Sequence, residues 1–287
     1  MRRLVLAVGA LTLAATACTV PTNRVATLPG DPVVVAAAGD ISCPALARAK
    51  PTKCQQAATA AAVADADYVV ALGDLQYPGG TTGTWTGYDA SWGALAAKTL
   101  PVIGNHEYLT PNGQAFYDYW ASKGFPQPRG VWTRPLGNGW TFVAVDANCG
   151  KIDCKAERVA LDAALVQSGP CTIVGWHQPK WSSGDHGSSV NKKVGDFWFT
   201  AVAYHVALVL NGHDHNYERT TPFDSTTEVV VGTGGKSMDL PTPPAAFTAV
   251  QIDNTFGHLR LSLTPNAYSA EYIDLAGAVG DSFSGTC

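Results

Sequence analysis

The segment LVLNGHDHNYER, residues 208–219, places ionisable side chains at the end of an apolar run. Its first residues suit a buried strand, and His213, Asp214 and His215 follow directly. Imidazole nitrogen is a common metal ligand, and two imidazoles on one short loop can serve one centre. The alternative is an ordinary polar loop, so the choice depends on what the rest of the chain supplies.

Four more polar clusters follow apolar runs elsewhere in the chain. They are Gly39-Asp40, Gly73-Asp74 with Tyr77, Gly104-Asn105-His106-Glu107, and His177 after VGW. One such cluster carries little weight, because glycine followed by a polar residue is common in turns. Five of them predict a shared site, since α/β folds build their sites at the carboxyl ends of strands. Carboxylate, phenol, amide and imidazole groups suit zinc, iron or manganese and would not select a soft ion.

Apolar, strand-like runs alternate with helical stretches over most of the chain. We expect helices over 55–66, 88–99 and 155–168, each between two strand-like runs. The C-terminal quarter instead holds four β-rich segments with short turns, EVVVGTGG, AFTAVQID, HLRLSLTP and AYSAEYID. This order predicts an α/β fold with a more antiparallel β portion at its end.

The N-terminus carries the signature of an export signal. Arg2 and Arg3 precede an apolar stretch over 4–14, and Ala15-Thr16-Ala17 forms a small-residue cleavage signal. The apolar stretch is too short to span a bilayer, which needs about 20 such residues. We expect a signal peptide over 1–17, a tether over 18–31 and a folded domain over 32–287.

The cysteines agree with an oxidising destination. Cys18 follows the cleavage signal in LAATAC, which resembles a loose bacterial lipobox, so lipid attachment and simple secretion are both open. The six other cysteines form an even set suited to three disulfides, for which 15 pairings exist. The absence of a Cys-x-x-Cys pair argues against a cysteine metal site. The favoured pairs are two local ones and one that ties down the C-terminus: Cys43–Cys54, Cys149–Cys154 and Cys171–Cys287.

The bulk composition excludes some classes of function. With 287 residues, 46% of them hydrophobic, the chain can bury a large core. Its net charge is −4 and no long basic run occurs, so binding to a nucleic-acid polymer is not expected. Membrane attachment is expected only through lipid on Cys18.

The five clusters, in this order, resemble the calcineurin-like metallophosphoesterase superfamily. Its pattern is GD, GDxx, GNH[ED], a histidine after a strand, and GHxH. Tyr77 in GDLQY, the VGWH segment and the HNYER tail are similar to the purple acid phosphatase branch, here as a short exported bacterial form. The resemblance covers roughly residues 33–235. It implies a four-layer α/β/β/α sandwich with a β-rich C-terminal part, and 32–287 would be the metallophosphoesterase catalytic domain.

The resemblance also implies a dinuclear metal centre, with Asp74 as the carboxylate that bridges both ions. The other ligands of the first ion would be Asp40, Tyr77 and His215. Those of the second ion would be Asn105, His177 and His213. In this branch a tyrosine ligand implies Fe³⁺ at the first site and Fe²⁺, Zn²⁺ or Mn²⁺ at the second. The alternative is a Tyr77 that only packs, with ordinary divalent ions at both sites.

Two further histidines receive catalytic roles from the resemblance. His106 would stabilise the transition state or act as general acid, and His186 in WSSGDHGSS matches a phosphate-contacting histidine. The implied function is an exported phosphatase that hydrolyses phosphomonoesters by in-line attack of a metal-bound hydroxide on a small phosphate ester. The alternatives are a phosphodiesterase or nucleotidase with the same centre, and a non-catalytic surface binding protein on the same fold.

Some neighbouring residues receive supporting or unrelated roles. Glu107 is expected to hydrogen-bond around the metal ligands. Arg219 is expected to brace the GHxH loop, with contact to substrate as the alternative. His205 is expected at the end of a helix and His258 away from the site. The sequence departs from plant relatives in having Ser42 where glycine is common, and His186 without an adjacent second histidine.

Overall fold

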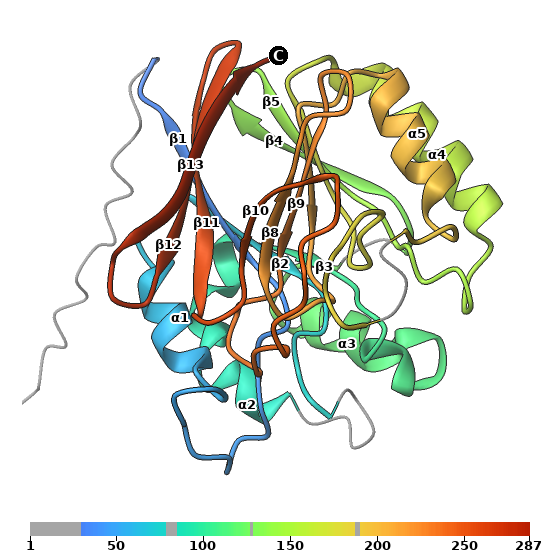
Figure 1. Ribbon diagram of the computed structural model, residues 1–287. Helices are drawn as coiled ribbons and strands as arrows, with labels where there is room; N and C mark the ends of the chain where they lie inside the picture. Colours follow the sequence, from blue (N-terminus) through green and yellow to red (C-terminus); the bar gives the residue numbers. More distant parts are fainter. Residues whose placement is uncertain (1–29, 79–84, 127–128, 187–189) are drawn as a thin grey trace, which may run out of the picture.

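The computed structural model describes residues 30–78, 85–126, 129–186 and 190–287. The predicted signal peptide and Cys18 lie outside these residues, so cleavage and lipid attachment stay predictions. Two β-sheets face each other, with helices on the outer side of each, as Figure 1 shows. This arrangement confirms the predicted α/β/β/α sandwich. Within the described residues, no helix has the length and apolar character needed to cross a membrane.

The first sheet joins the beginning of the chain to its end. Its strand order is β13-β12-β11-β1-β2-β3, with β1, β2 and β3 parallel and β11 antiparallel to β1. The predicted β-rich C-terminal portion therefore extends the sheet that begins with β1. The strands are β1 (Val33–Ala38), β2 (Tyr68–Leu72), β3 (Thr99–Val102), β11 (Gly257–Thr264), β12 (Ala267–Asp274) and β13 (Val279–Thr286).

The second sheet has the order β10-β8-β9-β7-β6-β5-β4. Strands β5, β6, β7 and β9 run parallel, while β4, β8 and β10 pair antiparallel with their neighbours. The strands are β4 (Trp132–Gly137), β5 (Trp140–Ala144), β6 (Thr172–Gly175), β7 (Leu208–Asn211), β8 (Tyr217–Thr220), β9 (Thr227–Val231) and β10 (Thr248–Ile252).

Helices connect the parallel strands. They are α1 (Gln56–Ala62), α2 (Thr86–Asp89), α3 (Gln114–Ser122), α4 (Cys154–Ser168) and α5 (Gly195–Ala203), with 3₁₀ helices η1 (Trp92–Lys98), η2 (Glu107–Leu109) and η3 (Pro111–Gly113). Helix α4 starts where expected because the Asp153 carboxylate accepts from the N–H groups of Lys155 and Ala156.

The single helix expected over 88–99 is wrong. Helix α2 ends at Asp89, and a 3₁₀ helix over Trp92–Lys98 follows it. Between them, the Ser91 hydroxyl donates to the carbonyl oxygens of Gly87 and Tyr88, at 2.9 and 3.2 Å. Serine hydroxyls that bond to nearby carbonyls compete with the regular helical pattern, which accounts for the break.

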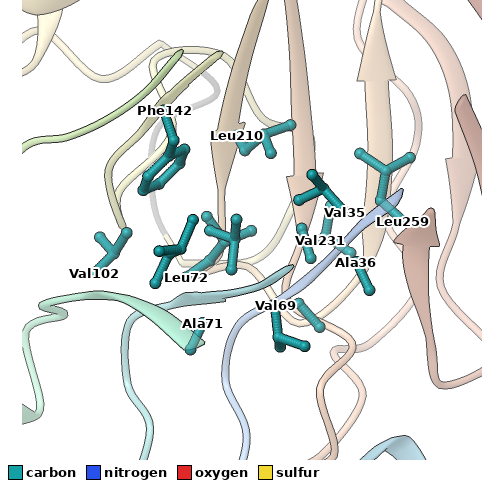
Figure 2. Packing of buried hydrophobic residues seen from close by; sticks show 14 of the residues in the cluster. Val35, Ala36, Val69, Ala71, Leu72, Val102, Phe142, Leu210, Val231 and Leu259 are labelled. Atoms are coloured by element: carbon teal, nitrogen blue, oxygen red, sulfur yellow. The ribbon is translucent and has the colours of Figure 1, made fainter. Parts of the chain in front are cut away.

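The core lies between the sheets and continues under the helices of the second sheet. Leu72 of the first sheet and Phe142 and Leu210 of the second meet in the space between them, as Figure 2 shows. Their neighbours in the second sheet, Val143 and Val209, face a separate cluster beneath α4 and α5. Successive strand residues point to opposite faces, so a sheet covered on both sides needs continuous apolar runs. This explains why the strands read as unbroken apolar stretches.

Three disulfides connect the six predicted cysteines. They join Cys43 to Cys54, Cys149 to Cys154 and Cys171 to Cys287. The favoured pairing is confirmed. The first two close loops at the edge that carries the polar clusters, while the third joins the start of β6 to the C-terminus.

Candidate metal centre

The polar clusters converge because the parallel strands that precede them end at one edge of the two sheets. Strands β1, β2 and β3 lead to Asp40, Asp74 and Asn105, and β6 and β7 lead to His177 and His213. The carboxyl ends of parallel strands lie together, so side chains from distant parts of the chain meet there.

The four side chains predicted for the first ion surround one point. The hydroxyl oxygen of Tyr77 lies 2.8 Å from Asp40 Oδ1 and 3.0 Å from Asp74 Oδ2. It also lies 3.3 Å from His215 Nε2, and His215 Nε2 is 3.3 Å from Asp40 Oδ1. All four residues are buried. Two carboxylates, a phenol and an imidazole thus present their ligand atoms to one small volume.

The second set meets the first at Asp74. The same Asp74 Oδ2 that contacts Tyr77 lies 3.3 Å from His177 Nε2. The His177 and His213 rings are 5.2 Å apart between centroids. Asp74 is therefore the carboxylate shared by both sets, the position that a bridging ligand requires.

Two buried ligand atoms of the second set are incompletely satisfied. Within the described residues, Asn105 Oδ1 has no hydrogen bond, and His177 Nε2 has none besides its contact with the Asp74 carboxylate at 3.3 Å. Leaving a buried polar atom unpaired costs about 1–3 kcal/mol. A cation at this position would satisfy both atoms, so the donor set fits a metal ion.

The backbone at the centre is strained. Asp40, Asp74 and His213 have φ of 57°, 49° and 77°, in the left-handed region that side chains disfavour. Each such residue costs on the order of 1–3 kcal/mol, and such strain concentrates at functional sites. At Gly73, with φ of 88°, an added Cβ would lie 2.5 Å from His177 Nδ1. Only glycine lets that ring come so close.

Hydrogen bonds orient the two histidines that flank Asp74 and Asp40. His177 Nδ1 lies 2.7 Å from the Leu72 carbonyl oxygen, so this nitrogen donates and Nε2 faces the centre. Burial alone would lower the pKa of His177, but the Asp74 and Asp40 carboxylates outweigh it and raise the pKa to about 10. Metal ions compete with protons for such a nitrogen, so binding would release this proton.

His215 is held in the same way by residues that the sequence did not indicate. Its Nδ1 lies 2.9 Å from the Ser237 hydroxyl, and its backbone N–H donates to Asp239 Oδ2 at 2.6 Å. Ser237 and Asp239 follow β9, far along the chain from any of the polar clusters. The Gly-Gly pair at 234–235, which follows an apolar run, was the sequence feature that could have indicated a further loop at the centre.

Glu107 fastens two of the ligand loops together. Its carboxylate accepts the backbone N–H groups of Asp74, Leu75 and Gly104, at 2.9, 2.9 and 2.7 Å. The side chain is buried. Burial and the nearby Asp74 carboxylate raise the pKa of Glu107 to about 8, although the N–H groups of Gly104 and Leu75 and the nearby His177 act in the opposite direction. Glu107 thus positions the loops that follow β2 and β3 relative to each other.

We expect Glu107→Gln to destabilise the metal-free protein by about 1–3 kcal/mol at pH 6, where the raised pKa keeps Glu107 neutral and the two side chains differ in hydrogen bonding and not in charge. Glutamine has one acceptor oxygen and would turn its NH₂ group toward a backbone N–H that needs an acceptor. The free energy of unfolding in urea measures the effect. Glu271→Gln, at an exposed position of β12, is the matched control. Equal stabilities of the two variants would contradict the role of Glu107.

His106 lies at the edge of the centre. Its side chain is 35% exposed, and its Nε2 is 3.8 Å from Asp74 Oδ2. Its ring stands against Tyr77 at 4.3 Å between centroids. Its Nδ1 has no hydrogen bond within the described residues. His106 therefore combines closeness to both predicted ions with access to solvent.

His186 also lies over the centre, on the side of the GHxH loop. Its ring is 5.1 and 5.2 Å from the rings of His213 and His215. Hydrogen bonds to the Asp214 and Asp239 carboxylates raise the pKa of His186 to about 11. Asp214 thus points away from the predicted ions and toward His186, at 3.2 Å. The result is an imidazolium at the rim, 38% exposed.

Two buried glutamates hold the segment that precedes His186. Glu218 accepts from the Ser183 N–H at 2.6 Å and from its hydroxyl at 2.8 Å. Glu228 accepts from the N–H groups of Lys180 and Trp181 at 2.7 and 2.9 Å. Strands β8 and β9 thereby position the loop that carries His186.

Arg219 lies away from the centre. Its guanidinium forms two hydrogen bonds with the Asp281 carboxylate, at 2.7 and 3.1 Å, and stands over the Phe283 ring. Both partners belong to β13. Arg219 thus joins β8 to the other sheet, which agrees with bracing and contradicts the alternative of substrate contact.

His205 and His258 are also remote. His205 is exposed just after α5, near Ser225. His258 is buried in β11, in the wall of a cavity with Asp65 and Arg260. Burial and the nearby Arg260 lower the pKa of His258 to about 4.

The low pKa of His258 predicts a pH-dependent loss of stability. An unfolded histidine titrates near pH 6.5, so only the unfolded state binds this proton between pH 6.5 and 4. The stabilisation is complete above pH 6.5, falls by about 3 kcal/mol down to pH 4, and changes no further below that. Urea unfolding across this range should show a flatter curve for His258→Leu. His205→Leu is the control, and parallel curves for His258→Leu and the unmodified protein would contradict the prediction.

The comparisons with known proteins agree with this geometry. The family model for calcineurin-like phosphoesterases matches residues 33–217, more than half of the chain. The chain therefore belongs to the calcineurin-like phosphoesterase family, whose members are metallophosphoesterases. No curated protein matches the sequence.

Solved structures share the fold at low identity. A purple acid phosphatase from yellow lupin (Lupinus luteus) seeds superposes with a TM-score of 0.72 at 20% identity, covering 90% of this chain and 55% of the lupin chain. GAP50, the anchor in the inner membrane complex of Plasmodium, superposes with a TM-score of 0.70 at 15% identity, covering 89% of each chain. A dimetal phosphatase from Danio rerio superposes with a TM-score of 0.57 at 13% identity, covering 89% of this chain and 99% of the Danio rerio chain. The chain thus spans about half of the lupin enzyme.

The fold of this family implies two metal ions, and the donor atoms fit them. The nitrogen and oxygen ligands suit borderline or hard cations. One ligand atom from each of Asp40, Asp74 and His177 lies within 4.8 Å of the other two, close enough to share an ion. Together with the unpaired Asn105 oxygen, these contacts identify the centre as the place for the ions.

Proposed function

We propose that this protein is an exported, dinuclear metal-dependent phosphatase that hydrolyses phosphomonoesters by in-line displacement with water as the nucleophile. The observation that carries the proposal is the single oxygen of Asp74 shared between the two ligand sets, 3.0 Å from Tyr77 and 3.3 Å from His177. A carboxylate in this position would hold two cations close together. Export is supported by the N-terminal signal and by three disulfides, which form in oxidising compartments.

The residues divide the work of holding the ions. Asp40, Tyr77 and His215 would hold the first. Asn105, His177 and His213 would hold the second, with Asp74 common to both. When bound, two such ions supply Lewis acidity and a nucleophile from water at neutral pH.

Two histidines outside the ligand sets would act on the substrate. Protonated His186, held by the Asp214 and Asp239 carboxylates, would place a positive charge at the rim, where a dianionic phosphate approaches. His106, beside Asn105 and partly exposed, can hold a proton near the leaving oxygen or stabilise its developing charge. Both side chains are close to the ligands without belonging to them, as a transition-state contact requires.

Tyr77 provides the sharpest spectroscopic test. We expect protein matured with iron, zinc and manganese to contain two ions per chain and to absorb in the green, as tyrosinate-bound Fe³⁺ does. Tyr77→Phe should lose the absorption band, while Tyr68→Phe on β2 keeps it. Elemental analysis with a visible spectrum measures both. A colourless, active protein would assign divalent ions to both sites and would contradict iron ligation by Tyr77.

Turnover separates the proposal from its alternatives. We expect an aryl phosphomonoester to be hydrolysed faster than the corresponding bis-aryl phosphodiester. A tenfold preference for the diester would favour a phosphodiesterase. The fold also occurs in GAP50, an anchor, so a binding role is the other alternative. Protein that takes up no metal under these conditions would support that role.

A further inference from the structure

A cavity of about 660 Å³ joins the candidate centre to a group of lysines. Its lining includes Asn105, His186 and His213 of the centre. It also includes Lys151, Lys192 and Lys193, which no step of the proposed hydrolysis uses. We call this space the lysine cavity. A substrate held at the centre would therefore have its remaining part beside three primary amines.

The charge of the lysine cavity is opposite to that of the whole protein. The chain has a net charge of −4. Among the described residues that line the cavity, the one carboxylate belongs to Asp214, which is hydrogen-bonded to His186. Within the described part of the chain, none of the three lysines forms an ion pair. Apart from the Asp214–His186 pair, the described lining thus carries three lysine charges that no ion pair neutralises, which attracts anions.

The lysines also stand at the ends of helices where cations are unfavourable. Lys192 and Lys193 precede the first residue of α5, Gly195, and Lys151 precedes the first residue of α4, Cys154. The α5 N-terminus has no side-chain cap. A helix N-terminus carries partial positive charge, so a nearby lysine costs a few tenths of a kcal/mol and an anion gains a similar amount. Stability alone does not favour this placement, whereas binding of an anion does.

The loops that carry the lysines are anchored. The Asn191 N–H donates to the Lys180 carbonyl oxygen at 2.9 Å, and the Lys193 N–H donates to Asn191 Oδ1 at 3.0 Å. The Cys149–Cys154 disulfide closes the loop of Lys151. Cys149 Sγ lies 3.4 Å from the Lys193 carbonyl oxygen, so the two loops touch. The two loops that carry the lysines are therefore held against each other before a ligand arrives, which lowers the entropy cost of binding.

We propose that the lysine cavity binds a second phosphate group of the substrate. The preferred substrates are then small phosphate esters whose leaving group carries at least one more phosphate. A phosphate dianion matches several ammonium groups, for which lysine is a common partner in proteins. The inference rests on the proposed phosphatase function, because it assigns the remainder of the substrate held at the metal centre.

The test compares two substrates that differ by one phosphate. At low ionic strength, the metal-loaded protein should have a kcat/KM about tenfold higher for glucose 1,6-bisphosphate than for glucose 6-phosphate. K192Q/K193Q should reduce this ratio to about threefold or less and leave glucose 6-phosphate within about twofold. K50Q/K155Q removes the same charge at exposed positions outside the cavity lining and should keep the ratio. Salt at 0.5 M should also remove most of the preference, since it screens exposed charges.

A ratio near one in the unmodified protein, or an equal fall in both double variants, would overturn the lysine cavity as a phosphate site. If no phosphate ester is hydrolysed, the proposed phosphatase function fails and binding decides the inference separately. Calorimetric titration with glucose 1,6-bisphosphate should then show about tenfold weaker binding to K192Q/K193Q than to K50Q/K155Q. Equal affinities of these two variants would overturn the inference by itself.

Discussion

Replacing Asp74 with alanine should reduce the metal content from two ions per chain to at most one and lower turnover by at least about 10³-fold. The ions stabilise several kcal/mol of transition-state charge, and each 1.36 kcal/mol is a tenfold change in rate. Burial acts to raise the pKa of Asp74, but His177 and His106 hold it below its usual range, so the side chain is anionic. Without this charge, two cations would repel each other. Elemental analysis and the rate with an aryl phosphate measure both effects.

Two further variants separate charge from structure. The backbone N–H of His106 donates to Asp74 Oδ1 at 2.7 Å. Asp74→Asn keeps an acceptor for this N–H group but removes the negative charge. It should lose metal as Asp74→Ala does. Asp196→Ala removes an exposed carboxylate from α5 and should retain both ions. Full metal content and activity in Asp74→Ala would refute the shared-carboxylate geometry and with it the proposed function.

Replacing His106 with alanine should leave both ions in place and lower kcat by about 10²–10⁴-fold, the range for a positioned proton-transfer group. Its side chain stands beside the ligands without joining either set, 3.8 Å from Asp74 Oδ2. If His106 protonates the leaving oxygen, the loss should be larger for an alkyl phosphate than for p-nitrophenyl phosphate, whose leaving group needs no proton.

The control for His106 is His205→Ala, at an exposed histidine far from the centre. It should change neither rate nor metal content. An equal loss of rate for alkyl and aryl substrates in His106→Ala would assign the residue to charge stabilisation instead of proton transfer. Unchanged turnover would remove His106 from the mechanism.

Local patterns predicted the parts of the fold that depend on neighbouring residues. The apolar runs before Asp40, Asp74 and His213 identified buried strands, because a strand covered on both faces needs apolar residues at every position. The helical pattern over 155–168 identified α4. Short elements were missed: strands β4, β8 and β13 and helix α3 lack a clear period. Strands β4 and β13 lie at sheet edges, β8 has four residues and α3 has nine, so these elements obtain their stability from tertiary contacts.

The surroundings of the centre were less predictable than the ligand atoms. Ser237 and Asp239 orient His215 through contacts 22 and 24 residues away in the chain. The glycines at 234–235 mark a turn before them, but a serine or aspartate in a turn is common and does not indicate a contact with His215. The lysines at 192–193 and 151 are likewise unremarkable until two loops bring them into one cavity.

By itself, the sequence determined the alternation of strands and helices, the two local disulfide pairs, and the side chains able to bind metal. These depend on residue type and on spacing over a few positions, which set local hydrogen bonding and the direction of each side chain. Only the tertiary structure decided that one oxygen of Asp74 contacts both Tyr77 and His177, that Arg219 turns to Asp281, and that lysines gather beside the centre. Those relations depend on how two sheets meet, and the packing of the whole core determines that distance and angle.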